Sequence, residues 1–257
     1  MDLIDTLRST GAVREFTDQP VDDAAVARIL DTARFAPSGA NAQAWRVVVV
    51  KDPAVRTRLR DLYLPGWADY LTMSAAGLRP WAPVNDPRAE AAALAVASEQ
   101  AAALAVASEQ AAALAVASEQ AAALAAGSDQ GGPAVAGGLA AHLDEAPVLL
   151  ALFADLSALA AVDRDLDRYS FAGGASIYPF AWNVLLAARA EGLGGVITTM
   201  LIREEGPVKE LLGAPDPLAL AAVIALGHPV HQPRRLQRRP VPAFTTVDRV
   251  DGTPFPG

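Results

Sequence analysis

Residues 176–201 read SIYPFAWNVLLAARAEGLGGVITTML, which is the strongest structural signal in the chain. The first part, 176–191, is apolar on nearly every side of a helix, so it predicts a helix that other elements cover on most sides. The glycines of Gly192-Leu-Gly-Gly195 end this helix, and the apolar run 196–201 predicts a strand after them. These glycines follow a helix and not a strand, so they do not indicate a dinucleotide-binding turn.

Apolar segments on both sides of this stretch predict the rest of the sheet. Further buried strands are predicted at 46–50, 147–153 and 218–226, and the β-branched run 46–50 predicts a central strand. Helical spacing predicts further helices at 2–9, 22–35, 54–63 and 203–212. Because helices and strands do not alternate strictly, we expect an α+β sandwich with an antiparallel or mixed central sheet flanked by helices, and not a Rossmann fold.

An internal repeat fills the middle of the chain. The decapeptide AAALAVASEQ occurs in tandem at 91–100, 101–110 and 111–120, and a decayed copy occupies 121–130. Its residues favour helix, but a ten-residue period turns the leucines by about 80° per copy, so they form no continuous stripe. We therefore expect an Ala-rich helix that protrudes from the domain. A solenoid is the alternative, although solenoid units normally have at least about 20 residues.

The two flanks of the repeat are expected to form one domain over 1–257, interrupted by an insert at 89–132. Glycines at 127 or at 131–132 are expected to end the helix. No single face of this helix can bury all its leucines, so the insert should be less buried than the strands, of low local stability, and dispensable.

Composition narrows the possible function classes. With 52% apolar and 19% charged residues, the 257-residue chain is not disordered. Its net charge of −8 disfavours nucleic-acid binding. It has no cysteine and only three histidines, which excludes thiolate chemistry and makes a metal site unexpected. Without a signal peptide or an apolar window that could span a bilayer, we expect a cytoplasmic protein that does not bind membranes.

Few motifs indicate chemistry on their own. The chain has no G-x-S-x-G elbow, so a Ser–His–Asp hydrolase is not indicated. An arginine cluster near the C-terminus comprises Arg234, Arg235, Arg238 and Arg239. Their forked donors suit a phosphate or another small anion. The alternative is a solvated tail.

Several strings together resemble a known family. Gly11-Ala-Val-Arg-Glu-Phe16 is followed by Pro20-Val21, and residues 36–45 read APSGANAQAW before an apolar run. With 173–201 and Arg238-Arg239-Pro240, they resemble the FMN-dependent nitroreductase family over most of the chain outside about 75–135. The resemblance implies a nitroreductase-like α+β sandwich. It also implies a homodimer with two FMN sites at the subunit interface.

The resemblance further implies which residues bind the cofactor. Arg14 would hold the phosphate and ribityl chain of FMN, and Arg238 and Arg239 would close on the phosphate. Thr198 and Thr199, beside Ile197, would offer backbone N–H groups to the ring. A loop that packs against the flavin, commonly from the other subunit, would contribute Pro37, Ser38, Gly39 and Asn41. The chain departs from the family where Thr10 replaces an arginine and Ala12 replaces a serine, so two expected FMN contacts are missing.

Arg14 links the expected site to the expected chemistry. A positive charge near the pyrimidine end of the ring, from Arg14 or from an arginine of the C-terminal tail, would stabilise a reduced, anionic flavin. We expect Arg14 to lie close to Ser38 or Asn41, either within one subunit or across the dimer. The alternative is a local role, in which Arg14 caps the preceding helix or pairs with Glu15 or Asp18.

The implied function is oxidoreduction. A flavin carries the redox chemistry, so the protein supplies position, electrostatics and solvent control, and we expect no catalytic acid or base. The expected cycle is ping-pong: NAD(P)H reduces FMN and leaves, and a nitroaromatic, quinone or similar acceptor takes its place. One alternative is an FMN-binding protein that sequesters the cofactor without turnover. Another is an interaction scaffold that uses the repeat.

Overall fold

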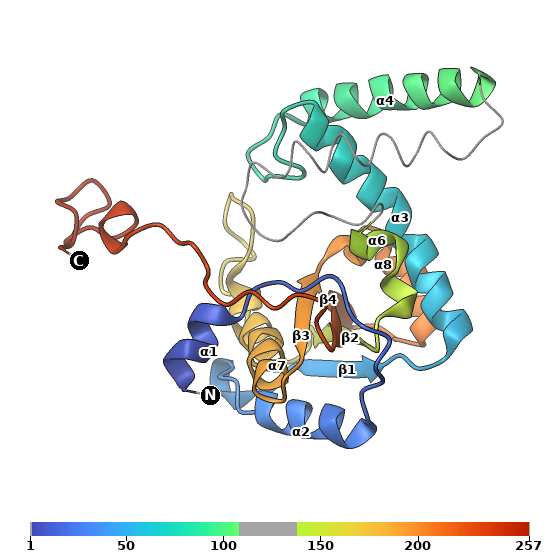
Figure 1. Ribbon diagram of the computed structural model, residues 1–257. Coiled ribbons are helices and arrows are strands. Elements are labelled where there is room, and N and C mark those ends of the chain that lie inside the picture. Colours follow the sequence, from blue (N-terminus) through green and yellow to red (C-terminus); the bar gives the residue numbers. More distant parts are fainter. Residues whose placement is uncertain (1, 108–137, 257) are drawn as a thin grey trace.

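The core of the molecule is a four-stranded antiparallel sheet. The computed structural model describes residues 2–107 and 138–256, and of 99–107 only the helical backbone. The strands are β1 (Trp45–Val49), β2 (Val148–Asp155), β3 (Gly194–Thr198) and β4 (Leu218–Gly227), in the order β1-β2-β4-β3. Every neighbouring pair is antiparallel. The predicted α+β architecture is confirmed, with helices around the sheet (Figure 1).

β1 lies at the edge of the sheet, so the prediction of a buried central strand at 46–50 is wrong. Val47 and Val48 are half-buried, while Val49 is 37% exposed. A β-branched run indicates that a segment fits a pleated, partly buried surface, but it does not indicate where in the sheet the strand lies. Among the described strands, β1 pairs with β2 only.

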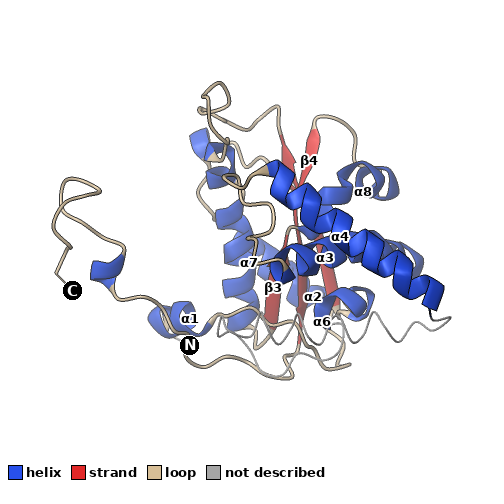
Figure 2. Ribbon diagram, turned by 90° about the horizontal axis from the view of Figure 1, so that it is seen from above, coloured by secondary structure: helices blue, strands red, loops and turns tan. Residues whose placement is uncertain are grey.

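Alternation along β2 supplies the core on both faces of the sheet. Leu150 and Leu152 pack on one face with α2 (Asp23–Ala33) and α7 (Tyr178–Ala190). Leu149 and Phe153 pack on the other face with α3 (Pro53–Ala75) and α8 (Glu205–Leu212). Successive side chains of a strand point to opposite faces, so one apolar run holds the helices on both sides of the sheet (Figure 2).

α7 is the apolar helix predicted at 176–191, but this chain covers only part of its surface. Ala181, Val184 and Ala188 are fully buried, whereas Tyr178 is 43% exposed and Trp182 is 37% exposed. Just after the helix, Gly192 has a φ of 81°, a left-handed conformation that favours glycine. Other elements therefore bury α7 on the side that faces the sheet, as expected, but apolar side chains on another side of the helix remain exposed.

α3 continues to Ala75, beyond the end predicted at residue 63. The helix continues through Pro65, although a proline removes a helical hydrogen bond and disfavours the preceding turn. Buried side chains on both sides of the proline, Tyr63 at 4% exposure and Met73 at 0%, bind the helix to the domain. Tertiary packing therefore overrides the local preference.

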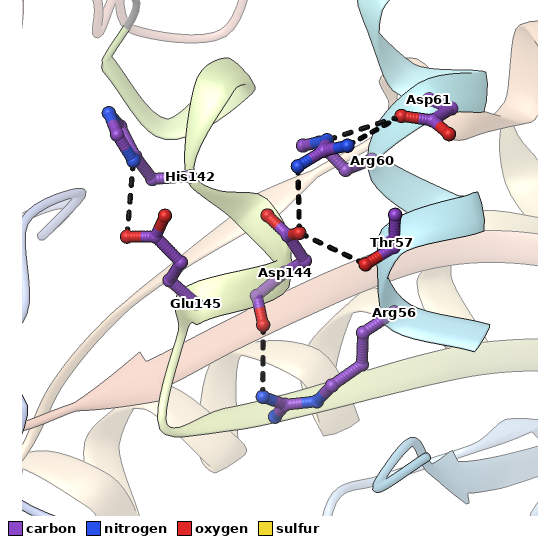
Figure 3. A network of polar contacts seen from close by, with 7 residues as sticks. All are labelled: Arg56, Thr57, Arg60, Asp61, His142, Asp144 and Glu145. Carbon is purple, nitrogen blue, oxygen red and sulfur yellow. Dashed lines mark hydrogen bonds and ion pairs between the residues drawn. The ribbon is translucent and has the colours of Figure 1, made fainter. Parts of the chain in front are cut away.

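Polar contacts fasten the start of α3 to the segment that follows α6 (Gly138–Ala141), as Figure 3 shows. The Arg56 guanidinium donates to the backbone oxygens of Val50 at 3.0 Å, Asp144 at 3.1 Å and Pro147 at 3.3 Å. Arg60 donates to the Asp144 carboxylate at 2.9 Å. Burial lowers the pKa of Arg56, and the charge of Asp144 opposes this shift. These contacts join the two flanks of the insert directly.

α4 (Pro87–Ala107) contains the first copy of the decapeptide. No side chain between residues 91 and 98 is buried, and Val96 is 53% exposed. In Figure 1 the helix lies apart from the sheet, beyond α3. This part of the repeat forms the expected protruding helix. The copies from residue 108 onward, and the glycines at 127 and 131–132, lie outside the described residues.

The N-terminal and C-terminal segments run side by side near β3. α1 (Leu3–Ser9) is capped by Asp2 and is followed by an extended stretch. In this stretch Thr17 N donates to His228 O at 2.8 Å, and Val230 N donates to Glu15 O at 3.1 Å. The remaining C-terminal arm, 229–256, extends beyond α1 in both views (Figures 1 and 2). Among the described helices none is long and apolar enough to cross a membrane.

Candidate functional site

The stretch after α1 pairs with β3 and thereby positions Arg14. Ala12 forms a bridge with Gly195, and Val13 N donates to Gly195 O at 2.9 Å. Val13 is buried at 3% exposure, and Gly194 approaches it so closely that a Cβ there would lie 2.7 Å from a Val13 methyl carbon. Because side chains alternate in an extended chain, the exposed Arg14 points away from this contact.

Arg14 lies near a buried tyrosine that the sequence analysis did not identify. The Tyr63 hydroxyl is 3.0 Å from the Thr198 hydroxyl, and Tyr63 is only 4% exposed. Burial raises the pKa of Tyr63, while the hydrogen bond to Thr198 and the positive charge of Arg14 act in the opposite direction. Tyr63 and Thr198 are thus hydrogen-bonded at the end of β3, and the charge of Arg14 acts on Tyr63. We call these three residues the β3-end cluster.

Thr198 and Thr199 mark the end of the β3 ladder. The last pair of β3 with β4 joins Thr198 to Val223, so the backbone of Thr199 lies beyond the ladder. Thr199 is exposed, and Met200 N donates weakly to the Thr198 hydroxyl at 3.5 Å. The side chain of Thr198 is thus engaged within the protein, and the exposed residue Thr199 follows directly after it.

The loop 37–43 forms a second part of the candidate site. Ser38 Oγ accepts from Gln43 N at 3.0 Å, and Gly39 N donates to Ser176 Oγ at 3.0 Å. Ala40 and Asn41 have φ of 50° and 54°. This left-handed conformation is uncommon for residues other than glycine and concentrates at functional sites. Pro37, Gly39 and Asn41 are exposed and Ser38 is half-buried, so the loop presents a shaped surface to the outside.

A buried carboxylate shapes the segment that leads to Ser176. Asp163 is 2% exposed and accepts from the backbone amide of Phe171 at 2.9 Å and from Arg168 at 2.8 Å. The Phe171 amide, together with Ser170 and Arg168, holds the pKa of Asp163 well below its usual range. This anchored turn precedes the short helix Ala172–Ser176, so it fixes the residue that receives the Gly39 amide.

The third part is the C-terminal arm. Arg238 lines a cavity of about 430 Å3 together with Arg8 and Thr10. Arg239 follows on the exposed side of the arm. The arm reaches this place because Gln232 donates to Ser9 O at 3.2 Å.

The structure thus assigns the expected site residues to three groups. Arg14 and Thr198 share the β3-end cluster, Pro37 to Asn41 share the loop, and Arg238 lies at the cavity beside Thr10. Within the described part of one chain, no hydrogen bond or ion pair joins Arg14 to Ser38 or Asn41. Their approach across a dimer stays a prediction.

A line of aromatic rings leads away from Tyr63. Its centroid is 6.5 Å from that of Trp67, which stacks on Tyr70 at 5.2 Å with an interplanar angle of 5°. Tyr70 is 6.4 Å from Trp81, and the Arg203 guanidinium lies 5.2 Å from the Trp81 centroid. Stacked rings with a cation over the last one are a surface suited to planar, electron-poor molecules.

Two residues of the candidate site, Tyr63 and Ser176, could not be found from the sequence. Tyr63 and Ser176 lie far along the chain from Thr198 and Gly39, and only the fold brings each pair together. Neither lies in a motif that names its role. The one available signal for Tyr63 was its apolar spacing on a helix, which predicts burial and not a hydrogen bond.

Comparisons with known proteins identify the family of the chain. The model of the nitroreductase family matches residues 7–228. An NADH dehydrogenase of Thermus thermophilus is 27% identical, covering 90% of this chain and 88% of its own length. An NADPH-flavin oxidoreductase of Vibrio harveyi is 37% identical over 31% of this chain and 33% of its own length. The crystal structure of nitroreductase A from Vibrio parahaemolyticus shares the fold, with a TM-score of 0.55, 22% identity and coverage of 93% of this chain and 72% of that one. The chain therefore belongs to the nitroreductase family and is an oxidoreductase.

Proposed function

We propose that the protein is an FMN-dependent oxidoreductase that passes reducing equivalents from NAD(P)H to a nitroaromatic, a quinone or a similar acceptor in a ping-pong cycle. The family match and the names of its relatives, an NADH dehydrogenase and an NADPH-flavin oxidoreductase, support the reductant and the flavin. The observation that carries the proposal is the β3-end cluster, in which Tyr63 is hydrogen-bonded to Thr198 and the charge of Arg14 acts on Tyr63.

The residues present fit a flavin mononucleotide. A phosphate needs cationic donors, and Arg8 and Arg238 line one cavity beside Thr10. The ring needs a cation at its pyrimidine end and backbone donors, and in this proposal Arg14 and the backbone amide of the exposed Thr199 take these roles. When bound, the flavin supplies hydride and electron transfer.

In this proposal the chain positions the flavin and polarises it, and no residue acts as a proton donor. Arg14 provides a permanent positive charge, because a guanidinium stays protonated at all relevant pH values. Tyr63 is nearly fully buried and holds the Thr198 side chain inside the protein through their hydrogen bond. The backbone at the end of β3 is thereby kept in a fixed position, which lowers the reorganisation needed during electron transfer.

The same proposal includes a homodimer. α1 exposes Leu3 at 64%, Ile4 at 49% and Leu7 at 40%, and the neighbouring Trp182 of α7 is 37% exposed. Apolar patches of this kind on a single chain mark interaction surfaces. A two-fold dimer would use the same patch twice, and it would allow the loop 37–43 of one subunit to meet the β3-end cluster of the other. Sedimentation equilibrium tests this, because a monomer at micromolar concentration contradicts it.

The aromatic line next to the β3-end cluster supports a planar acceptor. Trp67 and Tyr70 are half-buried and already stacked, so little side-chain entropy is lost when a flat molecule joins them. Arg203 over Trp81 adds a positive charge at the far end. Nitro groups and quinone oxygens carry partial negative charge, which such a cation attracts.

Anaerobic stopped-flow absorbance with NADH and NADPH tests the proposal. We expect the visible absorbance of bound flavin to bleach on mixing and to return when a quinone is added. A flavin that stays oxidised with both nucleotides would support the alternative function, in which the protein sequesters FMN without turnover. A protein that binds no flavin would contradict both functions.

A further inference from the structure

A second cavity lies where β2 and β4 meet the segment that leads from β2 to α7. Its volume is about 310 Å3. Ala154 of β2 and Ala221 of β4 line it from the sheet, and the rings of Tyr169, Phe171 and Tyr178 line it as well. Among the described residues that line this cavity, none is charged and none belongs to the β3-end cluster. The cavity is therefore distinct from that cluster.

The sheet is irregular at this cavity. Ala222 pairs with Leu152, whereas Leu220 pairs with Phe153, the next residue of β2. Ala221 thus has no partner on β2, and it lies beyond the end of the β3 ladder. Such bulges redirect side chains and are over-represented next to functional sites. The small side chain of Ala221 therefore faces the cavity from a position that the regular ladder does not occupy.

The segment that carries two of the aromatic rings is fixed by contacts within the protein. The buried Asp163 carboxylate accepts from the Phe171 amide at 2.9 Å. A Cβ on Gly174 would lie only 3.0 Å from a ring carbon of Tyr178, so the segment packs tightly on the start of α7. Because this wall is already ordered, a ligand that binds to it pays little further conformational entropy.

Three aromatic rings at the cavity have faces that a ligand can contact. Tyr169 and Phe171 are 70% and 71% exposed, and Tyr178 is 43% exposed. Within the described part of the chain, no ring contact joins them to another aromatic side chain. The Arg168 guanidinium lies 4.7 Å from the Phe171 centroid and covers one face of that ring only. Rings around a cavity suit a flat molecule, which they contact by stacking or edge to face.

Hydroxyl groups are the polar side-chain groups of the described lining. The Tyr178 hydroxyl donates to Ala221 O at 3.3 Å, and the Ser170 hydroxyl donates to Asp163 at 2.8 Å. Burial raises the pKa of Tyr178, and the neighbouring Tyr169 adds to this shift, so the Tyr178 hydroxyl is neutral at physiological pH. A neutral donor matches an uncharged acceptor such as a carbonyl oxygen. A carboxylate would lose its hydration here without gaining a cation.

We propose that this cavity is a binding site for a small, uncharged aromatic molecule that carries a carbonyl oxygen or another hydrogen-bond acceptor. The ring of the ligand contacts Tyr169 and Phe171, and its acceptor receives a hydrogen bond from Tyr178. The site is additional to the proposed flavin site and does not depend on it, because the ligand uses no residue of the β3-end cluster.

Saturation-transfer NMR titrations of the purified protein with three probes test the chemistry of the site. Benzamide is planar and uncharged, benzoate has the same ring with a charge, and cyclohexanecarboxamide has the same amide without a flat ring. We expect benzamide to bind at least about tenfold more tightly than benzoate, because the cavity offers no partner for a charge. It should bind about twofold to tenfold more tightly than cyclohexanecarboxamide, since only a flat ring stacks on the aromatic side chains. Equal binding of the three probes, or no binding of benzamide, would overturn the inference.

Variants locate the bound probe. Phe171→Leu and Tyr169→Leu each remove an exposed ring, and each should weaken benzamide binding about twofold to tenfold. Phe244→Leu is the matched control, because Phe244 is a 61% exposed ring of the C-terminal arm and is not among the described residues that line the cavity. Ala221→Leu fills the cavity and should abolish binding. If this variant unfolds, as judged by circular dichroism, the two variants of exposed rings carry the comparison.

Addition of FMN separates this site from the flavin site. We expect the affinity for benzamide to stay the same when the protein is titrated in the presence of FMN. Displacement of benzamide by FMN would place the probe in the flavin site and overturn the inference. Wild-type affinity in both Phe171→Leu and Tyr169→Leu would overturn it as well, as would an equal loss of affinity in Phe244→Leu.

Discussion

The two main parts of the candidate site are built in opposite ways. In the β3-end cluster, Tyr63 is 4% exposed and its hydroxyl is tied to Thr198, so this part is held by the core of the chain. The loop 37–43 is largely exposed and bonds mainly to itself, with Ala40 and Asn41 in left-handed conformations. The first part is complete in one chain. The second is shaped but turned outward, as expected if it serves a flavin held by another subunit.

The largest effect should come from removing the charge of the β3-end cluster. Arg14→Ala deletes a cation whose field reaches Tyr63. We expect FMN binding to weaken by about 1.5–3 kcal/mol, the usual contribution of a hydrogen bond to a charged group. Fluorescence titration of the purified variant measures this change. An unchanged dissociation constant would remove Arg14 from the site.

Removal of the Tyr63 hydroxyl tests how firmly the core holds this cluster. Tyr63→Phe leaves the ring in place but removes the shorter of the two hydrogen bonds of the Thr198 hydroxyl. We expect the free energy of unfolding to fall by about 0.5–1.5 kcal/mol, measured by urea denaturation. No loss of stability would mean that Thr198 is satisfied without Tyr63, and the cluster would then be less rigid than the comparison requires.

The same variant predicts a pH dependence. Burial raises the pKa of Tyr63 in the folded state above its value in the unfolded chain, which is about 10. Folding therefore favours the neutral hydroxyl. The stability that the neutral Tyr63 hydroxyl contributes to the folded state is fully present below about pH 10. It is lost as the pH rises through the folded-state pKa of Tyr63. The stability of the wild type should therefore fall relative to Tyr63→Phe above about pH 10. A constant difference between pH 7 and the alkaline range, measured by thermal melts, would contradict the burial of this hydroxyl.

Strain in the loop gives a smaller expected effect. Ala40 has a φ of 50°, and a left-handed conformation disfavours a Cβ by about 1–2 kcal/mol. Glycine relieves this penalty but loses about 0.5–1 kcal/mol more backbone entropy on folding. Ala40→Gly should thus stabilise the protein by roughly 0.5 kcal/mol at a fixed protein concentration. Destabilisation would mean that the Ala40 methyl group makes a contact that outweighs the strain.

The smallest effect is expected from the insert, which belongs to neither part. Deleting two copies of the decapeptide, residues 101–120, should leave flavin content unchanged and should change the free energy of unfolding by no more than about 0.5 kcal/mol. Arg56 and Arg60 join the flanks of the insert without it, and the described repeat side chains are not buried. Loss of flavin in the deletion variant would assign the insert to the site.

Local sequence patterns predicted which helices and strands form better than they predicted which elements lie next to one another. β2, β4 and α7 follow from their apolar runs, because burial of both faces leaves a clear signal. The edge position of β1 could not be predicted in this way, because an edge strand and a central strand can share one β-branched pattern.

The site was predictable only in part for the same reason. The residues of the loop and the end of β3 were named from motifs, but their partners Ser176 and Tyr63 come from distant elements. Such pairings are set by packing over long separations, and a short motif carries no information about them.

The central claim is that this chain is a flavin enzyme whose cofactor is FMN. The most direct measurement is the visible absorbance spectrum of the purified protein after incubation with FMN and removal of free ligand, with the bound flavin then released by heat and identified by mass. The account predicts a flavin spectrum, with FMN retained at one molecule per chain and lost from Arg14→Ala. A wild-type protein that emerges colourless would contradict it.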